Sequence, residues 1–269
     1  MTQQHHETEL DRVAQAMADA ARQVILPHFR NTALAADNKL DGGFDPVTEA
    51  DRAAERAMRD ILAAERPDDA ILGEEYGATP GTSGLTWVLD PIDGTRAFIS
   101  GTPTWGVLIA ISDADGPFYG LVDQPYIGER FIGGWCKATL TGPQGHSVLH
   151  TRAARDLSQA TIFTTFPEVG TPVEGNAFAA VAKQSRLTRY GMDCYAYALL
   201  AAGQIDLVIE AGLAPYDIQA PIALIHAAGG IVTDWQGGAA HGGGRALAAA
   251  NTDIHAQALE ILRGQPGVV

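Results

Sequence analysis

Residues 87–95, with the sequence Trp-Val-Leu-Asp-Pro-Ile-Asp-Gly-Thr, place two acidic side chains three positions apart after an apolar run. The run predicts a strand that ends at Asp90, and Pro91 and Gly94 predict a turn into a helix that begins at Gly94 or Thr95. The backbone N–H groups at the start of this helix could bind an anion. Two carboxylates held this close repel each other unless a cation or a proton neutralises them. Oxygen ligands favour Mg²⁺ or Mn²⁺, so the stretch indicates a metal site.

Three further acids lie at the ends of other predicted elements: Asp51, Glu74 and Asp217. Glu74 follows an apolar run, and Asp51 stands three residues after Thr48, which is the spacing of a helix capping box. Asp217 precedes an apolar helix and is expected at its N-cap. A turn or a cap would explain any one of these acids alone. The set as a whole indicates a metal-dependent site.

Composition and charge narrow the class of protein. The chain has 269 residues, and 18 Lys and Arg against 32 Asp and Glu give a net charge of −14 at pH 7. This charge disfavours nucleic acid as a partner, because the phosphate backbone would be repelled. The sequence has no apolar signal region and no run near the roughly 18 apolar residues of a membrane helix. With only two cysteines, a cytoplasmic protein without disulfides and without a membrane partner is expected.

Hydrophobic spacing predicts helices in the first thirty residues and over Glu49–Ala64, followed by short strands that pair mostly antiparallel. These strands are expected at 70–72, 86–89, 107–112, 118–123 and 129–133. Residues 140–158 are polar and turn-rich, which predicts a boundary between an N-terminal α+β half, 1–150, and a C-terminal α/β half, 151–269. In the second half, strands are expected at 161–165, 207–210 and 230–233, and helices at 178–184, 193–202 and 218–228.

Three motifs together resemble the inositol monophosphatase-like family of metal-dependent phosphatases over nearly the whole chain. They are Gly73-Glu74-Glu75, residues 90–95, and Tyr216-Asp217 followed by Ala-Ala-Gly-Gly at 227–230. The resemblance implies a layered αβαβα sandwich, of α+β and α/β character, and a homodimer. It also implies hydrolysis of a small phosphate monoester by a metal-activated water, with two or three Mg²⁺ ions per site that Mn²⁺ can replace.

The resemblance further implies roles for single residues. The implied metal ligands are Glu74, Asp90, the backbone carbonyl of Ile92, Asp93 and Asp217. The implied catalytic residues are Glu74, Thr95 and Asp51, which orient the water, and the amides of Gly94 and Thr95 would bind phosphate. Lys39 matches a lysine on a mobile loop of the family.

Residues 189–197, Arg-Tyr-Gly-Met-Asp-Cys-Tyr-Ala-Tyr, resemble the histidinol-phosphate phosphatase branch, which would place the protein in histidine biosynthesis. Asp193 and Glu210 form an acidic pair that could bind the substrate ammonium through charge-assisted hydrogen bonds. Asp193 could also cap the following helix, and the two roles are compatible. Arg96 is either a phosphate-attracting substrate residue or a surface residue.

Two alternatives remain open at this point. Relatives that bind polyols also use a glutamate like Glu210, so an inositol-1-monophosphatase or a broad sugar-phosphate phosphatase is the second hypothesis, and Asp193 is the residue that discriminates. The third hypothesis, from another class, is a regulatory scaffold that binds a protein partner.

Overall fold

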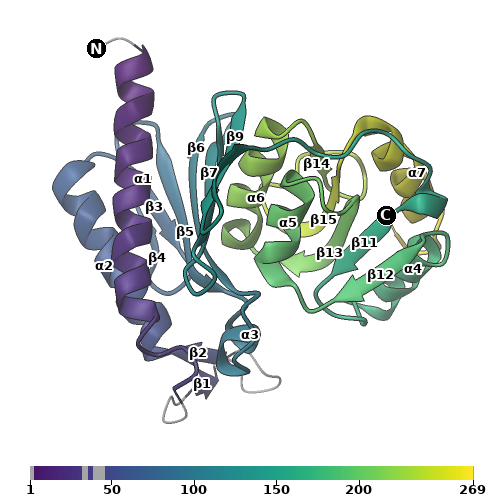
Figure 1. Ribbon diagram of the computed structural model, residues 1–269, viewed down its shortest axis with the longest axis horizontal. Helices are drawn as coiled ribbons and strands as arrows, with labels where there is room; N and C mark the ends of the chain where they lie inside the picture. Colours follow the sequence, from purple (N-terminus) through teal and green to yellow (C-terminus); the bar gives the residue numbers. More distant parts are fainter. Residues whose placement is uncertain (1–2, 32–35, 39–45, 269) are drawn as a thin grey trace.

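The structure is a computed structural model that describes residues 3–31, 36–38 and 46–268. Its elements form five layers, in the order helices, sheet, helices, sheet, helices (Figure 1). Helices α1 (Gln3–Ile25) and α2 (Glu49–Glu65) cover the outer face of the first sheet, α5 (Asp193–Ala201) and α6 (Pro215–Ala227) lie between the sheets, and α4 (Pro172–Ala182) and α7 (Thr252–Arg263) cover the far side. The predicted αβαβα sandwich is confirmed.

The first sheet has eight strands in the order β10-β9-β8-β7-β6-β5-β3-β4. Its neighbours pair antiparallel except β3 and β5, which are parallel. In chain order the strands are β3 (Ala70–Gly73), β4 (Gly77–Thr79), β5 (Thr86–Asp93), β6 (Gly106–Asp113), β7 (Gly116–Gln124), β8 (Glu129–Gly134), β9 (Lys137–Gly142) and β10 (Gly145–Val148). A short pair, β1 (Ala36–Asn38) and β2 (Pro46–Thr48), precedes them, and α3 (Thr95–Ile99) follows β5.

The second sheet has five strands in the order β12-β11-β13-β15-β14. They are β11 (Thr161–Thr164), β12 (Leu187–Tyr190), β13 (Leu207–Leu213), β14 (Ile231–Thr233) and β15 (Gly244–Ala249), with the 3-10 turn Leu157–Gln159 before β11. Strand β11 is parallel to β12 and β13, and β15 is antiparallel to β13 and β14. This sheet carries Glu210 on β13 to the side that faces the central helices.

Several sequence predictions need correction. The stretch 140–158 is not all turn, because β9 and β10 form a polar hairpin at the edge of the first sheet. Strand β5 runs to Asp93 and does not end at Asp90. The sequence reasoning also missed β4, β12, β15 and α7. Two of these four, β4 and β12, are short edge strands, whose solvent-facing residues give weak periodicity.

The outer helices pack on the first sheet through continuous apolar faces. Leu10, Val13, Met17 and Ile25 of α1 are no more than 1% exposed, and Ala54 of α2 is fully buried among them. The predicted capping box of α2 is present: Thr48 accepts the Ala50 N–H, and Asp51 accepts the Thr48 N–H at 2.8 Å. In the part of the chain that the structure describes, no helix has the length and apolarity to cross a bilayer.

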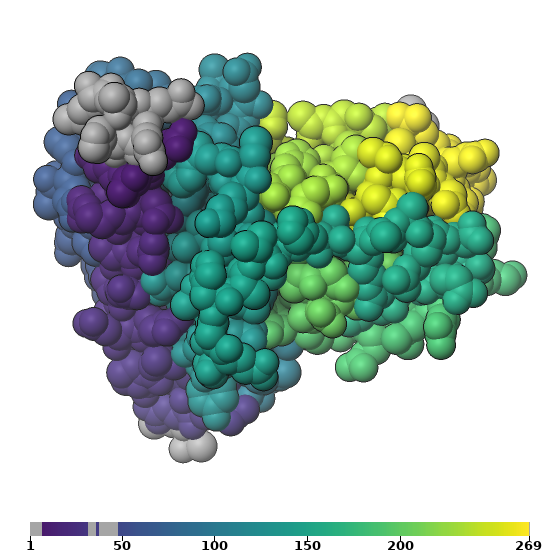
Figure 2. Space-filling view, turned by 45° about the horizontal axis from the view of Figure 1, so that its top comes forward, coloured from purple at the N-terminus to yellow at the C-terminus, as the bar shows by residue number. Residues whose placement is uncertain are grey.

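The central core joins both halves of the sequence. Val122 and Phe131 of the first sheet, Leu224 of α6 and Val208 of the second sheet belong to one buried cluster. Figure 2 shows the purple-to-teal part of the chain on the left beside the green-to-yellow part on the right, with a teal stretch that continues from the first part over the second. The expected division at residue 150 falls between the two sheets and stays a prediction as a division into domains.

Glycines let α6 approach the first sheet at backbone distance. A Cβ at Gly133 on β8 would lie 2.3 Å from Leu224 Cα, and one at Gly120 on β7 would lie 2.1 Å from the Ala220 carbonyl oxygen. These contacts are with backbone atoms, which cannot move aside alone. The close approach fixes the axis of α6 and therefore the place of Asp217 at its first turn.

We predict that Gly133→Ala destabilises the fold by about 1–3 kcal/mol through overpacking, because the new methyl group would push α6 from the sheet. Thermal melting measures the effect. Gly242→Ala is the control, since no heavy atom lies within 4 Å of its added Cβ, and it should melt like the parent. Equal melting temperatures for all three proteins would show that the helix does not depend on this contact.

Candidate active site

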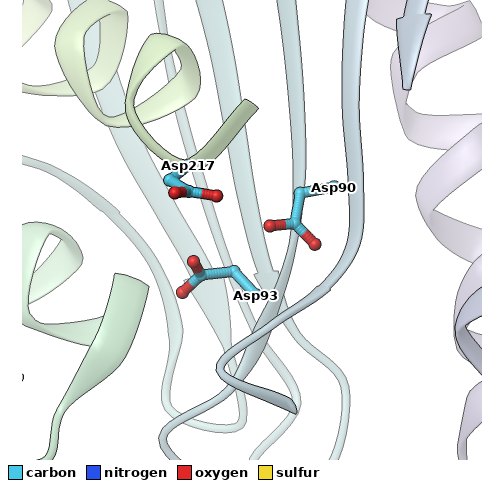
Figure 3. A group of neighbouring side chains, drawn as sticks. All are labelled: Asp90, Asp93 and Asp217. Atoms are coloured by element: carbon cyan, nitrogen blue, oxygen red, sulfur yellow. The ribbon is translucent and has the colours of Figure 1, made fainter. Parts of the chain in front are cut away.

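Three aspartates from two distant parts of the chain meet between the first sheet and α6. Asp90 and Asp93 lie on β5 and Asp217 on α6, and one carboxylate oxygen from each lies within 4.8 Å of the others. Figure 3 shows the three side chains pointing toward one another. The set predicted from the sequence is therefore brought together in space.

A β-bulge in β5 brings Asp90 and Asp93 to the same side. Asp90 pairs with Leu108 and Asp93 with Gly106, so three steps along β5 match two along β6. In a regular strand, residues three apart would face opposite sides of the sheet. The extra residue rotates the end of the strand and directs both carboxylates to the same side.

Backbone N–H groups hold each of the three carboxylates. The Ile92 N–H donates to Asp90 at 3.0 Å, and the Cys194 N–H donates to Asp93 at 2.7 Å. The Ala214 N–H donates to Asp217 at 2.7 Å. The predicted N-cap position of Asp217 is wrong: Ala214 is the N-cap, because Pro215 takes the first helical position and starts α6 three residues earlier than expected.

The cluster concentrates negative charge where Asp90 is buried and Asp93 and Asp217 are half-buried. Burial raises the pKa of Asp90 well above its usual range, and the charges of Glu74, Asp93 and Asp217 raise it further. Burial is also the largest cause that raises the pKa of Asp93, and the charges of Asp217 and Asp193 raise it further. Carboxylate oxygens are hard ligands that divalent cations prefer, and a bound divalent cation would offset the repulsion among them. The residues present therefore fit a metal site.

Asp51 and Thr95 lie next to the cluster. The Thr95 hydroxyl is 3.5 Å from the Asp51 carboxylate and 3.2 Å from the Ile92 carbonyl oxygen, so it can donate to either. Burial raises the pKa of Asp51 to about 6, although the two hydrogen bonds from Thr48 act in the opposite direction. Gly94 has φ of +84°, which suits glycine, and it is the N-cap of the five-residue helix α3.

A cleft of about 420 Å³ joins this cluster to the expected substrate residues. Its walls include Glu74, Gly94, Thr95, Arg96, Asp193 and Glu210. Lys39 lies outside the described residues. The structure thus places every other expected site residue at or beside one cleft, and their individual roles remain predictions.

Asp193 is positioned by tertiary contacts and does not cap α5. It is the first residue of that helix, Met192 is the N-cap, and Asp193 has φ of +47°. The Thr104 hydroxyl donates to its carboxylate at 3.2 Å. A Cβ at Gly94 would lie 2.8 Å from the Asp193 carboxyl carbon, so the two residues are in direct contact. This contact brings Asp193, the expected substrate residue, against Gly94, whose amide is expected to bind phosphate.

Glu210 lies in a hydrogen-bonded network that the sequence reasoning missed. Thr165 donates to it through its N–H at 3.0 Å and its hydroxyl at 2.5 Å, and the Tyr197 hydroxyl donates at 2.8 Å. On the same cleft, the Arg96 guanidinium lies 4.8 Å from the ring centre of Phe166. Single polar residues on strand ends and loops, such as Thr165, carry no motif by which sequence reasoning could have found them.

Comparison with known proteins identifies the family. The model of the inositol monophosphatase family matches residues 6–265. The chain belongs to this family. It is therefore a phosphatase, a phosphoric monoester hydrolase, of a family that uses divalent metal ions.

Three similar proteins illustrate the range of this family. The bifunctional phosphatase IMPL2, chloroplastic, of Arabidopsis thaliana is 42% identical over 270 residues, which cover 95% of this chain and 76% of the relative. A histidinol-phosphatase of Streptomyces coelicolor is 34% identical, over 93% of this chain and 96% of the relative. The solved structure of an inositol monophosphatase from Zymomonas mobilis matches with a TM-score of 0.83 and 39% identity, over 94% of this chain and 96% of that one.

We predict that the metal-free phosphatase loses stability as the pH rises. Asp90 and Asp93 bind protons more tightly in the folded chain than in the unfolded chain. Their contribution is therefore favourable below about pH 4, the unfolded pKa, and is lost as the pH rises through the raised folded pKa values. Mg²⁺ should restore this stability, so the melting-temperature difference between Mg²⁺ and chelator should be larger near pH 8 than near pH 5.

Asp93→Asn separates this effect from the general charge of the protein. The amide oxygen can still accept the Cys194 N–H, while one of the three clustered charges is removed. The variant should melt higher than the parent in chelator and gain little from Mg²⁺. A variant that melts lower in chelator and gains as much from Mg²⁺ as the parent would contradict the account.

Proposed function

We propose that this phosphatase hydrolyses histidinol phosphate to histidinol and phosphate. The observation that carries the proposal is a second acidic pair, Asp193 and Glu210, on the same cleft as the aspartate cluster. Histidinol phosphate carries an ammonium group close to its ester, whereas inositol phosphate carries only hydroxyls. Two carboxylates on the leaving-group side match that ammonium by charge and hydrogen bonding.

The electrostatics of the pair support a cationic substrate group. Burial raises the pKa of Asp193 to about 6; the Thr104 hydrogen bond acts against this, the charge of Glu210 adds to it, and the charge of Arg96 lowers it. Burial likewise raises the pKa of Glu210, against the hydrogen bonds from Thr165 and Tyr197. An ammonium between the two groups would offset their desolvation and favour both charged forms.

We infer that the cofactor is Mg²⁺, in two or three ions per site, with Mn²⁺ as a possible substitute. Asp90, Asp93 and Asp217 would hold these ions together with Glu74 and the Ile92 carbonyl oxygen. Bound divalent ions neutralise phosphate oxygens and make water a stronger nucleophile at neutral pH.

The protein residues would bind the phosphate and orient the water. The Gly94 and Thr95 amides at the start of α3 would face the phosphate oxygens. The attacking water would donate to Thr95 Oγ1, whose own proton lies within reach of Asp51 Oδ1 at 3.5 Å. Glu74 would hold the water from the other side, in line with phosphorus. Arg96, on the cleft wall, would add attraction for the dianion.

An inositol or sugar phosphate is the second candidate substrate. The Glu210 network supports it, because a carboxylate fixed by Thr165 and Tyr197 could accept a substrate hydroxyl equally well. Four expectations stay predictions: a role in histidine biosynthesis, a homodimer, a cytoplasmic location and the alternative of a regulatory scaffold. For the location, the Arabidopsis relative is named as chloroplastic.

We predict that the enzyme prefers histidinol phosphate to inositol 1-phosphate and that Asp193→Asn removes this preference. Loss of a charge-assisted hydrogen bond of about 1.5–3 kcal/mol should raise KM for the amine substrate by about 10–100-fold. Asparagine tolerates the positive φ of residue 193, so the fold should persist. Steady-state phosphate release with both substrates measures the change.

Asp60→Asn, which removes an exposed charge from α2, is the matched control and should leave both KM values at the parent level. The proposal is refuted if the parent enzyme prefers inositol 1-phosphate. It is equally refuted if Asp193→Asn leaves KM for histidinol phosphate unchanged.

A further inference from the structure

We propose that Glu55 of α2 is a positioning residue that holds the segment carrying Glu74 in place for metal binding. The Glu55 carboxylate accepts the Glu75 N–H at 2.7 Å and the Tyr76 N–H at 3.2 Å. These are the two residues that follow Glu74 directly. The inference rests on the proposed metal-binding role of Glu74.

The carboxylate of Glu55 lies directly against the backbone of this segment. A Cβ on Gly73 would lie 2.0 Å from Glu55 Oε1, so only a glycine leaves the carboxylate its place. The Glu55 side chain is fully buried, and Arg59, one helical turn later, balances its charge at 2.7 Å. Arg59 also donates to the Gly77 carbonyl oxygen and so closes the turn that follows Glu74.

Glu74 is thereby fixed from two sides. Its own N–H donates to the Leu89 carbonyl oxygen at 3.1 Å, and Leu89 immediately precedes Asp90 in β5. Glu55 holds the next two residues from the α2 side. A turn without these bonds could rotate the Glu74 carboxylate away from the aspartate cluster.

Helix α2 therefore positions two different parts of the site. Asp51 and Glu55 are four residues apart and lie on one face of the helix. Asp51 lies 3.5 Å from the Thr95 hydroxyl, while Glu55 holds the Glu74 segment. The spacing of the two acids on one rigid helix fixes the separation between the water-orienting residues and the expected metal ligand.

The test is Mg²⁺ binding by titration calorimetry to Glu55→Gln, without substrate. Glutamine keeps the side-chain volume and one acceptor oxygen. It cannot accept the N–H groups of both Glu75 and Tyr76 and form an ion pair with Arg59. Loss of such an outer partner typically weakens metal binding by about 10–100-fold, and we expect an increase of the Mg²⁺ dissociation constant in that range. Excess Mg²⁺ should restore most of kcat. Glu65→Gln, at the exposed end of the same helix, should bind Mg²⁺ like the parent.

Gly73→Ala tests the same contact from the other side. Its methyl group would displace the ends of the Glu55 and Arg59 side chains, so Mg²⁺ binding should weaken as in Glu55→Gln, and the melting temperature should fall because the displaced Glu55 carboxylate is buried. The two changes combined should weaken binding little more than either one alone, because they remove the same contact.

The inference is overturned if either variant binds Mg²⁺ like the parent, even with a lower melting temperature, because Glu55 would then serve the fold alone. Failure of the proposed function has a different signature. In that case, the parent itself would show no Mg²⁺ binding, or it would bind Mg²⁺ and not release phosphate from histidinol phosphate.

Discussion

Mutual repulsion among Asp90, Asp93 and Asp217 is the constraint on which this structure depends. Three carboxylates with oxygens within 4.8 Å of one another are unfavourable in a partly buried place, as the raised pKa values of Asp90 and Asp93 indicate. The fold nevertheless holds them there, with a bulge in β5 and a backbone N–H donated to each carboxylate. Stability is thus lowered locally, and a divalent cation would recover it on binding.

The layers of the sandwich supply the rigidity that this arrangement requires. Helix α6 contacts the first sheet at backbone distance over Gly120 and Gly133, and this contact fixes Asp217. Helix α2 packs on the other face and reaches the site through Asp51 and Glu55. The first turn of α5 adds Asp193, and the next residue, Cys194, donates its N–H to Asp93 on β5, so one helical turn holds both the expected substrate residue and the backbone donor of an expected metal ligand.

The residues of the site could be found from the sequence because carboxylates after apolar runs form recognisable motifs, as with Asp90 and Asp93. The geometry of these residues in the folded chain could not be found from the sequence in the same way. The bulge in β5 follows from pairing with β6, whereas the start of α6 has a local signal, Pro215 at the first helical position, that the sequence reasoning passed over. The contacts of Asp193 with Thr104 and of Glu210 with Thr165 join residues 89 and 45 positions apart, which no local pattern reveals. The hairpin of β9 and β10 resembles a turn-rich boundary for a different reason: it lies at the sheet edge, and β10 is exposed along its whole length, so its residues show no buried face.

The most direct test of the central claim is anomalous X-ray diffraction from crystals grown with Mn²⁺, collected on the parent and on Asp93→Asn. The account predicts a strong anomalous peak enclosed by the carboxylates of Asp90, Asp93 and Asp217 in the parent, and its weakening or loss in the variant. A parent crystal saturated with Mn²⁺ that shows these three side chains turned apart, with no peak among them, would contradict it.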